Sequence, residues 1–222
     1  MTAEAFVRAN TTVAAPPLVP ELRLHLATEI TPIWHATEET LARTGLPPPF
    51  WAFPWVGGQA LSRFLLDTPH VVAGKRVLDF GAGSGLVAIA AGRAGAASVT
   101  AAEIDEFAAA AIRLNAALNG AAVEVAVADL IGSAPAWDIV LCGDMCYERP
   151  LADRLTAWLE TLAGAGVRIL LGDPGRTYLP RERLHPLARY TVPTTRELED
   201  REQRETTVWE LVVAGNRSRT LL

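Results

Sequence analysis

The sequence is poor in cysteine and has no long apolar run, and both absences exclude certain classes of protein. Its 222 residues include two cysteines, Cys142 and Cys146, too few for a disulfide framework. No apolar run approaches the ~20 residues that a membrane-spanning helix needs. The first 20 residues hold one arginine, one glutamate and no continuous apolar block, which predicts neither a secretory signal nor a transit peptide. We expect a reduced, cytoplasmic setting without a membrane partner.

Positive charge and clustered metal ligands are also scarce. The formal net charge is -5 at pH 7, whereas binding to a nucleic-acid backbone needs a basic face. The four histidines are scattered, with no spacing typical of a metal site. The C-x-x-x-C spacing of the two cysteines matches neither a zinc knuckle nor a redox pair. We therefore expect no bound metal and no nucleic-acid partner.

Short apolar segments alternate with longer helical ones from residue 75 onward. Predicted strands lie at 75–80, 97–104, 122–130, 137–144 and 167–173, and predicted helices at 84–95, 106–120 and 149–166. Strands that alternate with helices of about 10–15 residues are typical of right-handed crossovers and a parallel, doubly wound sheet. The sequence therefore predicts an α/β fold.

The last part of the chain has a different pattern. Two predicted strands, within 188–195 and 206–215, flank the charged segment 196–205. They predict an antiparallel pair that closes one edge of the sheet. Such a charged segment is most often a solvated face laced with ion pairs, and the alternative is docking of a partner protein.

The first 50 residues are irregular and hold seven prolines. Segments 20–30 and 32–43 are predicted to be short helices or parts of an extended arm, separated by proline breaks. A helix is predicted at 56–67 from its apolar spacing. We expect a single compact domain over 55–222, with 1–54 as an arm and aromatic segment packed on it.

The stretch "VLDFGAGSGL" (77–86) follows a predicted strand and opens a predicted helix. Its three glycines, Gly81, Gly83 and Gly85, allow a tight turn and a close approach to a ligand, although a purely structural turn is the alternative. A dinucleotide-binding site typically has the motif G-x-G-x-x-G, and this sequence has Leu86 at the position of the last glycine. Asp79 lies two residues before the first glycine and suits a ligand with positive charge, such as an amino group and a sulfonium.

Acidic residues also end the next two predicted strands. Glu103 lies 18 residues beyond Gly85, where an acid can accept both hydroxyls of a ribose. Asp105 is better explained as the N-cap of the following helix. Asp129, at the end of the third strand, is a candidate acceptor for an adenine amino group, and a loop or cap role is the alternative.

The stretch "CGDMCYERP" (142–150) places Asp144 and Tyr147 at the end of the fourth predicted strand in a D-x-x-Y pattern. The stretch resembles the lysine methyltransferases of the seven-strand group, which carry D-x-x-Y at this position. Such an enzyme holds its nitrogen acceptor in line with the methyl group that the nitrogen attacks, at ~3–3.5 Å. An acceptor oxygen can orient its N–H groups, and an aromatic wall excludes water and holds a cation by its face. This resemblance implies that Asp144 and Tyr147 are the catalytic pair and that the preceding Gly143 contacts the cofactor.

Together, "VLDFGAGSG" and the acids after the second and third strands resemble the class I, seven-strand methyltransferases that use S-adenosylmethionine. The resemblance covers roughly residues 55–215. It implies a Rossmann-like sheet in the order 3-2-1-4-5-7-6 with the last strand antiparallel. It also implies that Asp79, the loop glycines, Glu103 and Asp129 hold S-adenosylmethionine.

A narrower resemblance rests on "PELRLHLA", "PPPFWAFPWVGGQALSRFLLD", "VLDFGAGSGLVAIAA" and "GDMCYE", which span most of residues 5–150. These stretches resemble the bacterial lysine methyltransferases of the electron transfer flavoprotein β-subunit. The resemblance implies that Trp55 lines the cofactor pocket, with Gln59 a weaker candidate. It implies a lysine of that subunit as substrate, and some bacterial relatives also act on the ribosomal stalk protein. Glu103 stands where many relatives have Asp.

Met145 and Cys146 stand where the amino-group methyltransferases of DNA and glutamine carry two prolines. A flexible primary amine is therefore the favoured acceptor, and we assign Asp144 to orienting it. We expect a monomer. Three alternatives remain: a methyltransferase for small-molecule amines on the same scaffold, a non-catalytic binding protein and, more distantly, a nicotinamide oxidoreductase.

Overall fold

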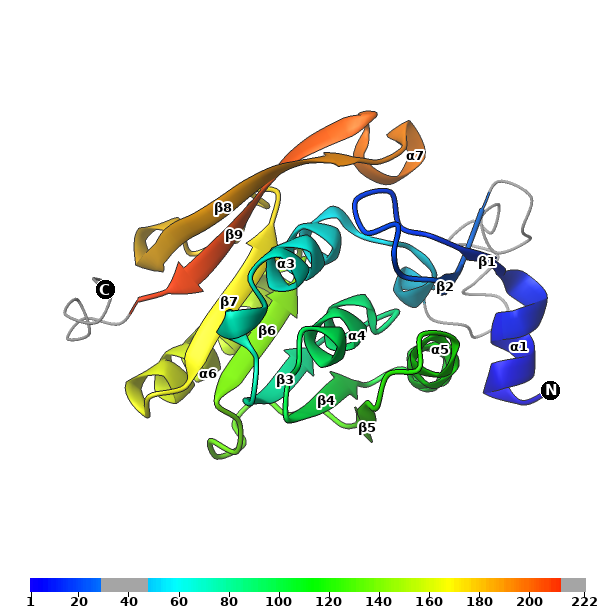
Figure 1. Cartoon of the computed structure of the whole chain (residues 1–222). Helices are drawn as coiled ribbons and strands as arrows, with labels where there is room; N and C mark the ends of the chain where they lie inside the picture. The colour runs from blue at the N-terminus through cyan, green and yellow to red at the C-terminus, as the bar shows by residue number, and fades with distance from the viewer. Residues whose placement is uncertain (29–47, 213–222) are drawn as a thin grey trace.

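The computed structural model describes residues 1–28 and 48–212 and contains a seven-stranded sheet. Its strands lie in the order β5-β4-β3-β6-β7-β9-β8 (Figure 1). The strands from β5 to β7 are parallel, whereas β9 is antiparallel to both β7 and β8. Numbered along the chain within the sheet, this is the order 3-2-1-4-5-7-6. The α/β, Rossmann-like fold predicted from the sequence is confirmed.

The elements agree closely with the predicted alternation. The sheet strands are β3 Arg76–Phe80, β4 Ser98–Glu103, β5 Glu124–Val127, β6 Ile139–Gly143, β7 Arg168–Asp173, β8 Leu184–Pro193 and β9 Gln203–Leu211. The longer helices are α3 Val56–Asp67, α4 Leu86–Arg93, α5 Glu106–Leu118 and α6 Arg149–Gly164. Within the described residues, no helix is both long enough and apolar enough to span a membrane.

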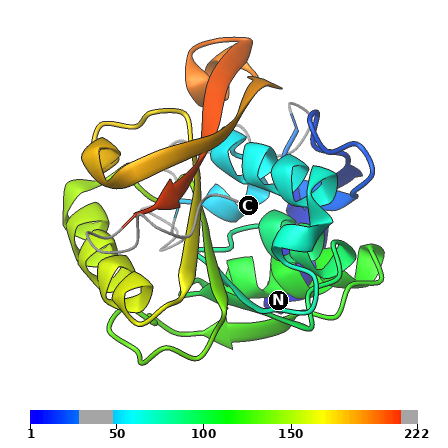
Figure 2. The same cartoon turned by 60° about the vertical axis from the view of Figure 1, so that its left-hand side comes forward.

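Helices cover both faces of the sheet, and the alternation of side chains along each strand decides what each face contacts (Figures 1 and 2). On β3, Val77 belongs to a core shared with α3 and α4, whereas Leu78 and Phe80 belong to a core shared with α6. Successive side chains of a strand point to opposite faces. Asp79 therefore faces the side of α4, and Phe80 faces the other side.

The N-terminal arm packs beside α5. Helix α1 (Ala3–Asn10) is followed by a small antiparallel pair, β1 (Thr12–Ala14) and β2 (Leu24–Leu26). Asn115 of α5 accepts a hydrogen bond from the His25 N–H at 2.7 Å and donates to the Ser84 carbonyl at 2.8 Å. The described part of segment 20–30 contains the short strand β2, which fits the extended-arm alternative rather than a helix, and residues 29–30 and segment 32–43 lie outside the described residues. The division of the chain after residue 54 stays a prediction.

Close approach of α3 to the sheet depends on glycine. A Cβ on Gly57 would collide with the Gly172 carbonyl oxygen and the Asp144 carboxylate. A Cβ on Gly143 would lie 2.9 Å from the Cα of Gly58. The small residues at the start of α3 and at the ends of β6 and β7 let the helix N-terminus contact these strand ends directly. This contact brings α3 to the carboxyl edge of the sheet, where the site lies.

Candidate functional site

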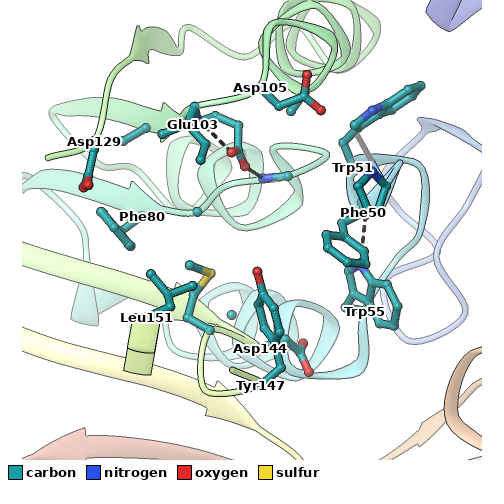
Figure 3. A pocket seen from close by; sticks show the side chains of 18 of the residues that line it. Phe50, Trp51, Trp55, Phe80, Glu103, Asp105, Asp129, Asp144, Tyr147 and Leu151 are labelled. Carbon is teal, nitrogen blue, oxygen red and sulfur yellow. Dashed lines mark hydrogen bonds between the residues drawn. The ribbon is translucent and has the colours of Figure 1, made fainter. Parts of the chain in front are cut away.

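A cavity of about 520 Å³ opens at the carboxyl ends of β3, β4 and β6 (Figure 3). Eight of the ten residues predicted for the site line it: Trp55, Gly81, Gly83, Glu103, Asp129, Gly143, Asp144 and Tyr147. Glu103 lies on one side of the cavity, and Asp144 and Tyr147 lie on the opposite side (Figure 3). Asp79 and Gly85 are not among the lining residues.

The glycine loop forms one wall of the cavity. Gly81 and Gly83 have φ of +66° and +51°, a backbone conformation that glycine adopts at little cost. A Cβ on Gly81 would collide with the thioether of Met145, which also lines the cavity. The Gly83 N–H donates to Glu103 Oε2 at 2.9 Å. The loop therefore places backbone, rather than side chains, against any ligand.

The two predicted site residues outside the cavity lie behind the loop. Asp79 is 1% exposed, and its Oδ2 accepts a hydrogen bond from the Ala88 N–H of α4 at 2.9 Å. Burial raises the pKa of Asp79 to about 7. Gly85 has φ +78°, and a Cβ there would meet the side chain of Ile112 on α5. The structure thus places Asp79 against the first turn of α4 and Gly85 against α5, both behind the loop.

The acids after β4 and β5 differ in their surroundings. Glu103 is bound to the Gly83 and Ile104 N–H groups at 2.9 Å each, and burial raises its pKa. Asp105 accepts from the Phe107 N–H at 2.8 Å, which confirms its predicted role as the N-cap of α5. Asp129 is half-exposed and pairs with Arg154 at 2.7 Å, and both side chains line the cavity.

Asp144 lies directly after β6 in a strained and buried position. Its φ is +56°, in the left-handed region that few residues other than glycine, asparagine and aspartate adopt. Oδ2 accepts from the Gly58 N–H of α3 at 3.0 Å, and Oδ1 accepts from Arg176 Nη2 at 2.8 Å. Burial raises the pKa of Asp144 to about 6, although the Arg176 guanidinium opposes this rise.

Arg176 is a lining residue that reasoning from the sequence missed. It lies after β7, and its guanidinium also donates to Glu199 Oε1 at 2.7 Å. The signal was present in "GDPGR" (172–176), because a Pro-Gly turn after β7 delivers an arginine beside the end of β6. Glu199 belongs to α7 (Arg196–Glu199), in the charged segment predicted to be a solvated face. That prediction is wrong for Glu199, whose side chain is 4% exposed.

Aromatic side chains form the wall beside Asp144. The Phe50 ring lies 6.0 Å from Trp55 and 5.9 Å from Tyr147, between ring centres. The Trp55 indole N–H donates to the Phe50 carbonyl at 2.8 Å, which fixes the ring (Figure 3). Gln59 is buried away from the cavity and binds the Pro54 carbonyl and the Leu18 N–H, so it ties the arm to α3.

Comparison with known proteins identifies the family. The chain is 40% identical over 212 residues to an electron transfer flavoprotein beta subunit lysine methyltransferase of Xenopus laevis, covering 92% of this chain and 85% of the relative. The corresponding human protein is 37% identical over 214 residues, covering 93% and 80%. The chain belongs to this lysine methyltransferase family. S-adenosylmethionine is accordingly its cofactor.

Two broader comparisons concern a related family profile and the fold. The profile of the ribosomal protein L11 methyltransferases (PrmA) matches residues 59–148. Magnesium protoporphyrin IX methyltransferase from Synechocystis PCC 6803, solved with bound S-adenosylmethionine, is similar in fold with a TM-score of 0.54 at 19% identity, covering 71% of this chain and 81% of that one. A Thermoplasma acidophilum protein gives a TM-score of 0.55 at 18% identity, with 71% and 90% covered. These structures show a shared fold.

The residues of the cavity fit S-adenosylmethionine. A carboxylate offers roughly four acceptor positions, and the two N–H groups on Glu103 leave room for ribose hydroxyls. The glycine loop offers exposed backbone beside it, and the acids on both sides of the cavity suit a cofactor with a sulfonium and an amino group. The geometry of the cavity therefore agrees with the cofactor of the family.

Proposed function

We propose that this enzyme methylates the ε-amino group of a lysine in a protein, with the electron transfer flavoprotein β-subunit as its substrate. The observation that carries the proposal is the placement of Asp144 and Tyr147 at the end of β6, facing Glu103 across one cavity. Glu103, Asp129, Trp55, Gly143 and the glycine loop hold S-adenosylmethionine in this proposal, and Asp79 and Gly85 support the loop. The relatives' names supply the lysine and the flavoprotein.

The acceptor amine must lose a proton before it can attack. Lysine has a pKa near 10.4 in water, so its neutral form is scarce at pH 7. Bound S-adenosylmethionine supplies a methyl group on a positively charged sulfur. Asp144 accepts an N–H of the amine and aims its lone pair, while Tyr147, Phe50 and Trp55 exclude bulk water. Desolvation by these rings lowers the pKa of the amine, and its proton leaves to water.

The experiment is transfer of labelled methyl groups from S-adenosylmethionine to purified flavoprotein. We expect label on the β-subunit, lost when the modified lysine, located by mass spectrometry, is replaced by arginine. Lys75 is the only lysine of the enzyme itself, so Lys75→Arg excludes self-methylation as the source. Label that appears only on small molecules of a cell extract would overturn the proposal in favour of a metabolite amine methyltransferase.

A ribosomal protein is the second candidate substrate. The match of residues 59–148 to the L11 methyltransferase profile favours it. Ribosomal subunits purified from a strain lacking the enzyme serve as the second acceptor in the same assay. We propose that the enzyme acts in the cytoplasm and that it is a monomer; light scattering of the purified protein tests the oligomeric state.

A further inference from the structure

The guanidinium of Arg176 connects three parts of the chain around the acceptor site. Its Nε and Nη2 donate to Asp144 Oδ1 at 3.2 and 2.8 Å, and Nη2 also donates to Glu199 Oε1 at 2.7 Å. Its Cζ lies 5.9 Å from the centre of the Trp55 ring. Arg176 thus contacts the predicted catalytic aspartate, the predicted cofactor-lining tryptophan and the tip of the β8–β9 hairpin.

The loop that carries Arg176 is itself fixed. Asp173, at the end of β7, is 2% exposed, and its Oδ1 accepts from the Gly175 and Arg176 N–H groups at 2.6 and 2.7 Å. If Arg176 left, the 4% exposed carboxylate of Glu199 would keep only Arg204, at 4.0 Å, as a cationic partner among the described residues. A buried carboxylate without a close partner is strongly unfavourable. We therefore expect the Arg176 guanidinium to keep its contacts with Asp144 and Glu199 when substrate binds.

Asp144 keeps an acceptor position while Arg176 is bound. In the part of the chain that the structure describes, three donors reach its carboxylate: one N–H of Gly58 and two of Arg176. A carboxylate has roughly four such positions, so one remains for an N–H of the substrate amine. The guanidinium and the amine can thus be held by the same carboxylate at the same time.

We propose that Arg176 is a positioning residue, which holds Asp144 ionised and aimed at the acceptor amine throughout methyl transfer. This inference rests on the proposed lysine methylation. The positive charge of Arg176 has a second effect, because a nearby cation also favours the neutral form of the substrate amine. Asp144 alone would retain the amine as an ammonium ion. The pair Asp144–Arg176 orients the amine without retaining its proton.

The charges around Asp144 set the sign of the expected effect. The groups that face it are Arg176, Asp173 from β7, Glu199 from α7 and Cys146 from its own loop, with Arg204 of β9 behind Glu199. Arg176 lowers the pKa of Asp144, whereas Asp173 and Glu199 raise it. Loss of Arg176 therefore raises this pKa, and loss of Glu199 lowers it.

The first test needs no substrate. The side-chain carboxyl carbon of Asp144 is titrated by NMR in ¹³C-labelled protein, with Asp144→Asn to assign the signal. In Arg176→Gln we expect the pKa of Asp144 to rise by about one unit or more, the range for an opposite charge at this distance. In Glu199→Gln it should fall. Arg181→Gln is the matched control, because Arg181 binds the Gly175 carbonyl of the same loop instead. Equal titration in wild type and Arg176→Gln would overturn the inference.

The second test is the pH profile of kcat with the protein substrate. Without Arg176, the pKa of Asp144 and the pKa of the substrate amine both rise, so the acidic limb of the Arg176→Gln profile should move to higher pH by about one unit. The Kd for S-adenosylmethionine should stay within about threefold of wild type. Arg176→Lys keeps the charge but loses the planar fork, so it should restore the position of the limb and lower kcat. A lower KM of Arg176→Gln with an unchanged pH profile would overturn the inference. Arg176 would then only compete with the substrate amine for Asp144. A wild-type enzyme inactive on every protein would refute the proposed function, whereas the NMR titration decides the role of Arg176 separately.

Discussion

At the scale of single residues, Asp144 combines a left-handed backbone with a buried carboxylate. Its φ of +56° and its bond to the Gly58 N–H mean that many substitutions would disturb the backbone as well as the charge. Asparagine tolerates the left-handed region and can still accept from Gly58. It therefore removes the charge and keeps the left-handed backbone and the bond to Gly58, while its amide nitrogen replaces the oxygen that accepts from Arg176.

We predict that Asp144→Asn lowers kcat by about 100-fold or more, because the amine is no longer aimed at the methyl group. Asp144→Ala should abolish turnover. In both variants the Kd for S-adenosylmethionine, measured by calorimetry, should stay within about threefold of wild type. Loss of cofactor binding together with turnover would show that Asp144 is structural.

Glu103 offers the complementary test on the cofactor side. We predict that Glu103→Ala weakens binding of S-adenosylmethionine by about 10-fold or more, the cost of losing hydrogen bonds to a charged group. The matched control is Glu124→Ala, because Glu124 is exposed at the start of β5, away from the cavity. Calorimetry measures both dissociation constants, and an unchanged value for Glu103→Ala would contradict the assignment.

At the scale of elements, the N-terminus of α3 connects Asp144 to the aromatic wall of the cavity. It carries the N–H that binds Asp144 and follows directly on Trp55. Gly57 and Gly58 are neighbours with different surroundings. A Cβ on Gly57 meets the Gly172 carbonyl oxygen, whereas one on Gly58 meets only Val87, at 3.8 Å.

We predict that Gly57→Ala lowers the free energy of unfolding by about 2 kcal/mol or more, since backbone atoms cannot move aside cheaply. Gly58→Ala should change it by less than about 0.5 kcal/mol. Urea unfolding of the two variants measures the difference. Equal losses would show that flexibility of the glycine pair, rather than close contact with β7, explains the sequence.

At the scale of the whole molecule, the N-terminal arm is connected to the catalytic core through α5. Asn115 is fully buried and links β2 to the glycine loop through the His25 N–H and the Ser84 carbonyl. Asn119, one turn later, binds the N–H and carbonyl of Arg23 near the surface. Asn115 binds β2 and Asn119 binds the residue just before it, and Asn115 also reaches the glycine loop.

We predict that Asn115→Ala costs about 2–4 kcal/mol of stability, because two buried backbone groups lose their partners. Asn119→Ala should cost about 1 kcal/mol or less, because water replaces its bonds. Urea unfolding gives both values, and hydrogen exchange of residues 24–26 reports on the arm. Equal costs would mean that the arm does not depend on the buried link.

Most of the fold was predictable because its signals are local. The alternation of short apolar strands with helices, the glycine loop and the N-cap at Asp105 each lie within a few consecutive residues. Parallel strands in this order bring their carboxyl ends to one edge, so the D-x-x-Y stretch and Glu103 could be assigned to a common site. The arm was less predictable, since β2 takes its partners from α5 and β1.

The sequence by itself determined the sheet, its order through the family resemblance and eight of the residues that line the cavity. Only the tertiary structure decided the rest. Asp79 faces α4 because side chains alternate along β3, and Arg176 is paired with both Asp144 and Glu199. These two partners lie 32 and 23 residues from Arg176 along the chain. They meet because β7 lies next to β6 in the sheet and the β8–β9 hairpin brings α7 over the ends of these strands. No pattern of neighbouring residues in the sequence predicts such a contact.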